Sequence, residues 1–163
     1  MTGRTVFRVL SLLALLGWMA VIFWFSAQNA ETSSAMSGGL IEQVAGAITP
    51  GFAELPEEEQ IAVVDQWQNV VRKGAHMAEY AVLGALTWIA ASGWIRRYRI
   101  RAAVATVVGL LYATGDEIHQ AFVPGRGPGV LDVGIDFIGV CIGLAAAAGV
   151  TALWRRRKTR KQA

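Results

Sequence analysis

The chain has 163 residues, of which 54% are hydrophobic and 17% are charged, and its mean hydropathy is +0.42. A soluble domain of this length carries roughly 45–50% apolar and about 25% charged residues, whereas here the apolar residues fall in four long blocks. The composition excludes a disordered chain, and a single cysteine, Cys141, excludes a disulfide scaffold. We therefore expect a small polytopic membrane protein.

The four apolar blocks predict an all-α, integral membrane four-helix bundle that forms a single domain over residues 1–163. The expected spans are about 9–26, 74–95, 102–123 and 130–154, with an outer loop at 27–71 and a basic tail at 155–163. The first block also resembles a cleaved signal peptide, but its apolar core of roughly 17 residues exceeds the usual 7–15. An uncleaved helix is the favoured interpretation, and the expected location is the cell membrane, crossed several times.

Twelve of the fifteen Lys and Arg residues gather in three clusters that contain no acidic residue. The clusters are Arg4 and Arg8, then Arg96, Arg97, Arg99 and Arg101, then Arg155, Arg156, Arg157, Lys158, Arg160 and Lys161. All twelve Asp and Glu residues lie between Glu31 and Asp136. They are on the other side of the apolar blocks from the three basic clusters. The positive-inside rule then predicts that both termini and the 96–101 loop are cytoplasmic. Nucleic acid is disfavoured as a partner, because membrane orientation explains all three clusters together.

The outer loop contains two amphipathic stretches. In the first, apolar residues recur at helical spacing between Leu40 and Ile48, although an ordinary solvated acidic loop is the alternative. The second follows Pro56 and begins with three Glu residues, which suit the positive end of a helix dipole. Its apolar residues favour a helix that lies on the bilayer surface.

Polar residues gather near the outer ends of the last three blocks. The expected lining of one outward-facing pocket is Arg72, Lys73, His76, Glu79, Tyr80, Asp116, Glu117, His119, Gln120, Arg126, Asp132 and Asp136. At 1.5 Å per residue, three of the carboxylates lie roughly 8–11 Å below the outer surface. An ionisable group near the bilayer centre costs ~2.5–3.5 kcal/mol, so such groups usually face a protein interior or a water-filled cavity. A clamp of paired acids and bases that only holds the bundle together is the alternative.

Helical spacing assigns these residues to shared faces. Asp116 and His119 lie on one face of their helix, whereas Glu117 is turned by about 100° from Asp116 and can point elsewhere. Asp132 and Asp136 share a face with Gly139 and Gly143, and the two glycines would let a neighbouring helix approach closely.

Several short strings in the chain resemble the VanZ-like family. They are Ser26-x-Gln28, RKGAHMAEY at 72–80 and DEIHQAFVPGR at 116–126, followed by Asp132 and Asp136 before a Gly-rich helix. The resemblance covers nearly all of residues 20–145. It implies an integral membrane protein of the bacterial cell envelope, and the namesake of the family is linked to resistance to the glycopeptide antibiotic teicoplanin. For this chain, that function is an expectation by analogy.

The first functional hypothesis is that the pocket binds the headgroup of a lipid or of a cell-wall precursor. Arg72, Lys73 and Arg126 would supply positive charge, and the guanidinium group suits bidentate contacts with phosphate or carboxylate. The lipid bilayer is then the expected partner, and the oligomeric state stays open.

The alternative is an intramembrane hydrolase or transferase that acts on a lipid-linked phosphate. Its catalytic candidates are His76, Glu79, Asp116 and His119, and the two pairs at i, i+3 spacing could each present two ligands to a divalent metal. This metal signal is weak, so the sequence predicts no definite cofactor and leaves open whether the protein is an enzyme. Ser26 is expected to have no adjacent base. A proton relay is disfavoured, because the inner halves of the helices nearly lack polar side chains.

Overall fold

The structure is a computed structural model that describes residues 2–28, 30–125 and 129–160. Over these residues the chain forms five α-helices and one short 3-10 helix, with no strand, which confirms the all-helical expectation. The elements are α1 (Gly3–Ser26), α2 (Ala30–Ile48), η1 (Phe52–Glu54), α3 (Glu57–Ser92), α4 (Tyr98–Gln120) and α5 (Val130–Arg160).

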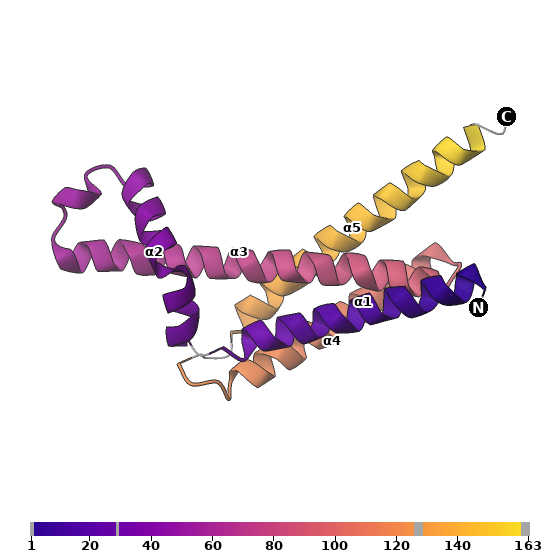
Figure 1. The fold of residues 1–163 in the computed structure, drawn as a ribbon, viewed down its shortest axis with the longest axis horizontal. Helices are drawn as coiled ribbons and strands as arrows, with labels where there is room; N and C mark the ends of the chain where they lie inside the picture. Colours follow the sequence, from indigo (N-terminus) through magenta and orange to yellow (C-terminus); the bar gives the residue numbers. More distant parts are fainter. Residues whose placement is uncertain (1, 29, 126–128, 161–163) are drawn as a thin grey trace.

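Helices α1, α3 and α4 run alongside one another, and α5 crosses α3 (Figure 1). Within the described residues, α1 and α5 are long and apolar enough to cross a membrane, by length and composition alone. The other two expected spans lie in α3 and α4. These helices carry most of the polar residues singled out in the sequence, which lowers their hydropathy.

Helix α3 joins two segments that the sequence separates. The stretch after Pro56, expected as a surface helix, continues without a break into the predicted span at 74–95. The reason is local, since residues 57–73 contain neither Gly nor Pro to end a helix. The resulting 36 residues measure about 54 Å at 1.5 Å per residue, well beyond a hydrocarbon core of about 30 Å. The N-terminal half of α3 therefore extends past the bundle (Figure 1).

Helix α2 crosses this extended half of α3 (Figure 1). Ile41 and Ala45, which share one face at i, i+4 spacing, are buried. The first amphipathic stretch of the outer segment is therefore a packed helix and not a solvated loop.

Two glycines bring α5 against the backbone of α3. A Cβ atom added to Gly139 would overlap the carbonyl group of Met77, and one added to Gly143 would overlap the backbone of Ala81. No larger residue fits at either position unless the helices separate. The expectation that these glycines permit close helix packing is confirmed.

The basic clusters meet at one end of the bundle. Arg8 Nε of α1 donates to the carbonyl oxygen of Gly93, just after α3, at 2.8 Å. Arg101 of α4 lies 4.7 Å from the ring centre of Trp88 and lines a small cavity together with Arg155 of α5. Both chain termini lie toward this end (Figure 1). The acidic residues of α4 and α5 lie at the opposite ends of these two helices.

Candidate functional site

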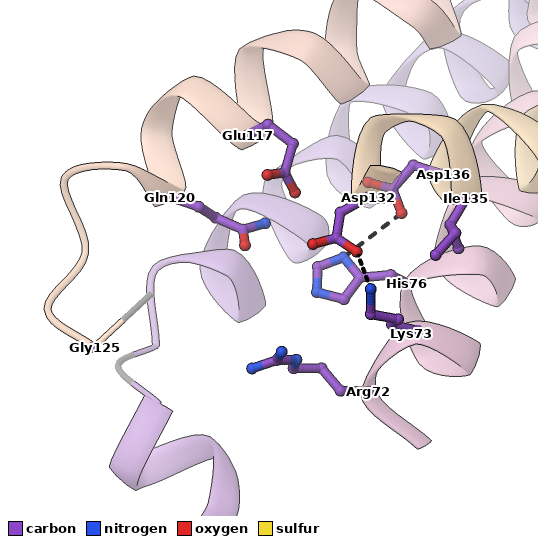
Figure 2. A pocket seen from close by; sticks show the side chains of 9 residues that line it. All are labelled: Arg72, Lys73, His76, Glu117, Gln120, Gly125, Asp132, Ile135 and Asp136. Atoms are coloured by element: carbon purple, nitrogen blue, oxygen red, sulfur yellow. Dashed lines mark hydrogen bonds and ion pairs between the residues drawn. The ribbon is translucent and has the colours of Figure 1, made fainter. Parts of the chain in front are cut away.

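A cavity of about 100 Å³ opens between α3, α4 and α5 at the end of the bundle away from the basic clusters. Figure 2 shows its wall, with side chains from three helices turned toward one another. The lining residues are Arg72, Lys73, His76, Glu117, Gln120, Gly125, Asp132, Ile135 and Asp136. Seven of these residues belong to the lining expected from the sequence, so the structure brings distant segments together as the helical faces indicated.

The mouth of the cavity carries two cationic side chains of α3. Lys73 Nζ lies 2.7 Å from Asp132 Oδ1 of α5, and the two side chains are 41% and 33% exposed (Figure 2). Arg72 borders the same cavity, and its Nη2 donates to the side-chain oxygen of Asn69 at 3.0 Å. Positive and negative groups therefore stand side by side where the cavity meets solvent.

The floor of the cavity is formed by His76 of α3 and Asp136 of α5. The Nδ1 atom of His76 lies 3.8 Å from Oδ1 of Asp136, whose residue is 1% exposed. Asp116, which was expected in the cavity wall, does not line it but lies next to this pair: the three potential ligand atoms lie within 4.8 Å of one another. Glu79 interacts electrostatically with Asp136 but is not part of the cavity wall.

Asp116 is held by donors from two helices. Its Oδ2 accepts hydrogen bonds from Ser26 Oγ of α1 at 2.8 Å and from Gln120 Nε2 of α4 at 3.1 Å. The expectation that Ser26 has no adjacent base is therefore wrong. Sequence reasoning missed Ser26 as a site residue, and its one signal was the Ser-x-Gln string after the first apolar block.

Glu117 and the turn after α4 shape the remaining wall. Glu117 is buried, and its Oε2 accepts from the backbone N–H of Gly129 at 2.9 Å. It therefore points into the site, although it is turned away from Asp116 around the helix. Gly125, with φ of 76°, occupies the left-handed region that favours glycine. Gly125 and Ile135 line the cavity without having been predicted.

Three other predicted residues do not line the cavity or cannot be placed. The ring of His119 packs against Phe23 of α1, with 4.6 Å between ring centres. Tyr80 is fully buried in the core. Arg126 lies outside the described residues. Among the described residues, the group of potential ligand atoms does not contain both members of either i, i+3 pair but takes one residue from each of three helices.

The sequence also matches a family model. The model is described as VanZ/LLP1, and it matches residues 11–154, which include every residue of the cavity wall. No curated protein and no solved structure matches the chain.

Proposed function

Because this chain belongs to the VanZ/LLP1 family, we propose that it is a multi-pass protein of the bacterial cell membrane whose outward-facing pocket binds a phosphate-bearing headgroup. The headgroup is that of a membrane phospholipid or of a lipid-linked cell-wall precursor. By occupying or rearranging this ligand, the protein contributes to tolerance of glycopeptide antibiotics such as teicoplanin.

Apolar surface and charge support the membrane part of the proposal. Large apolar side chains such as Leu13 of α1, Leu111 of α4 and Val150 of α5 are more than half exposed, as expected for helices that face lipid. The three basic clusters converge at one end, which the positive-inside rule assigns to the cytoplasm. Helices α1, α3, α4 and α5 would then span the bilayer, with both termini inside and the cavity outside.

The single observation that carries the ligand proposal is the mixed charge of the cavity wall. Within the part of the chain that the structure describes, Arg72 donates to an amide and pairs with no carboxylate, so its guanidinium group is suited to a bidentate contact with a phosphate. The carboxylates of Glu117 and Asp132 can accept from hydroxyl or amine groups on the same headgroup. The cavity exceeds the roughly 30 Å³ occupied by one water, so it can admit a small polar group.

A binding experiment tests this proposal. The purified protein is mixed with vesicles of phosphatidylglycerol, with vesicles of phosphatidylethanolamine, or with a lipid-linked cell-wall precursor, and bound lipid is quantified by native mass spectrometry. Arg72→Ala should weaken binding of the preferred lipid by about tenfold or more, since a hydrogen bond to a charged group contributes about 1.5–3 kcal/mol. Arg97→Ala, at the opposite end, is the matched control. Equal binding by both variants would exclude the pocket as the binding site.

A susceptibility assay tests the cellular role. Expression of the wild-type chain in a susceptible bacterium should raise the inhibitory concentration of teicoplanin, and Arg72→Ala should not do so at equal abundance in the membrane. If the wild-type chain gives no increase, the contribution to tolerance is refuted. Headgroup binding is still decided by the vesicle experiment.

A further inference from the structure

The floor of the cavity contains a buried carboxylate that accepts no hydrogen bond from the described residues. Asp136 is 1% exposed, and neither of its side-chain oxygens has a hydrogen-bond partner among the described residues. Its distance of 3.8 Å to His76 Nδ1 is too long for a hydrogen bond. His76 therefore stands at ion-pair distance but leaves both carboxylate oxygens without a hydrogen bond. Because buried polar atoms are nearly always hydrogen-bonded or bound to a metal, Asp136 points to a further ligand that satisfies it.

Two further potential metal-ligand atoms lie close to the carboxylate of Asp136. The nitrogen of His76 and a carboxylate oxygen of Asp116 lie within 4.8 Å of each other and of Asp136. The three residues come from three helices, so the group depends on the folded bundle rather than on a local run of acids. Imidazole nitrogen and carboxylate oxygen together suit zinc and related divalent transition metals.

The surroundings of Asp116 resemble a supporting shell for a metal ligand. Ser26 Oγ and Gln120 Nε2 both donate to its Oδ2, and they fix the orientation of the carboxylate. Ligating carboxylates in metal sites are themselves hydrogen-bonded in this way. Both donors are buried side chains, so the bonds are sheltered from water.

We propose that His76, Asp116 and Asp136 bind one divalent cation, of the zinc or manganese class, at the floor of the cavity. Three protein ligands leave a coordination position open, and His76 and Asp136 line the cavity, so that position faces incoming ligands. Metal–ligand bonds of about 2.0–2.2 Å require the three atoms to lie closer together than the 4.8 Å that now bounds their separations. The cation would neutralise the negative charge of the carboxylates around it. It would also provide, deeper in the cavity than Arg72, a second positive charge that can bind phosphate.

The test uses the metal alone. The full-length purified protein is stripped with a chelator, titrated with Zn²⁺ and in parallel with Mn²⁺, washed, and analysed by elemental mass spectrometry. One ion per chain should be retained. Asp136→Asn preserves the shape of the side chain and should lower the affinity by more than the 10–100-fold typical for changes in the supporting shell. His76→Ala should do the same, whereas His119→Ala, which removes a histidine outside the group, should bind like the wild type.

Two further variants distinguish this site from incidental binding. Ser26→Ala should weaken the metal affinity by about tenfold, because it loosens Asp116 without removing a ligand. Replacing Glu57, Glu58 and Glu59 together by Gln should leave binding unchanged, since that exposed run is remote from the cavity.

The proposal is overturned if the wild-type chain retains no ion, or if Asp136→Asn and His76→Ala bind as the wild type does. Loss of the ion in the Glu57–Glu59 variant alone would also overturn it. Because no lipid is present, these outcomes decide the cation site independently of headgroup binding.

Discussion

Ser26 and Asp116 are 90 residues apart in the sequence, yet the serine hydroxyl donates to Oδ2 of the aspartate at 2.8 Å. Both residues are buried, and they join the end of α1 to the end of α4. Helix α1 thus holds in place a residue, Asp116, that lies next to the floor of the cavity. The same helix also contacts α3, where Trp18 Nε1 donates to the backbone oxygen of Glu79 at 2.9 Å.

Removal of the Ser26 hydroxyl should destabilise the bundle. In Ser26→Ala, Asp116 loses one of two buried donors, which should lower the free energy of unfolding by about 1–3 kcal/mol. The measurement is reversible unfolding in detergent. Ser92→Ala is the control, because that hydroxyl only donates within its own helix, to the oxygen of Ile89. Equal losses for the two variants would show that the bond between α1 and α4 contributes nothing specific.

The glycine contact between α3 and α5 should be intolerant of any side chain. Gly143→Ala directs a methyl group into the backbone of Ala81, and overpacking of this kind costs about 1–3 kcal/mol. Gly149→Ala on the same helix has open space around it and should be neutral or stabilising by up to about 1 kcal/mol. Unfolding of both variants in the same detergent checks the difference. If Gly143→Ala is as stable as Gly149→Ala, the close helix crossing is wrong.

The ion pair at the mouth of the cavity should contribute little to stability. Lys73 and Asp132 are 41% and 33% exposed in their side chains, and solvent screens pairs of this kind. A double-mutant cycle of Lys73→Ala and Asp132→Ala should give a coupling energy below about 1 kcal/mol, and the coupling should fall as salt is added. A coupling energy well above this range would mean that the mouth of the cavity is shielded from water.

The proposed orientation in the membrane, which rests on the basic clusters, can be tested by labelling. In a Cys141→Ala background, a cysteine placed at Glu58 should react with a membrane-impermeant maleimide on intact cells. A cysteine placed at Arg157 should react only after the cells are lysed. The opposite pattern would put the cavity on the cytoplasmic side and would remove the basis for an extracellular headgroup ligand.

The all-helical fold and the glycine contact could be predicted because they depend on patterns within one segment. Long apolar blocks indicate helices, and the spacing of Gly139 and Gly143 places both on the same face of their helix. The length of α3 could not be predicted from hydropathy, because the polar stretch before Gly74 differs in composition from the span but not in backbone conformation. A hydropathy profile indicates which part of a helix can lie in lipid, but it does not indicate the residue at which the helix begins.

The site was predicted only in part, because it depends on how separate helices pack and not on a pattern within one segment. Helical spacing shows which residues share a face, but it does not fix how far each helix is rotated toward its neighbours. His119 lies three residues from Asp116, yet its ring packs on Phe23, whereas Glu117 points into the cavity wall. Ser26 reaches Asp116 only through the packing of α1 on α4, and no local pattern encodes that contact.

The close contact at Gly139 has a consequence for how the protein tolerates different surroundings. Gly139 follows Asp136 by three residues, less than one helical turn, so the height of the carboxylate is set by a backbone-to-backbone contact with Met77. The apolar residues on the opposite side of α5, such as Ile138 and Ile142, can change without shifting it. The position of the carboxylate therefore depends on the contact between the two helices, and not on which apolar side chains cover the outer face of α5.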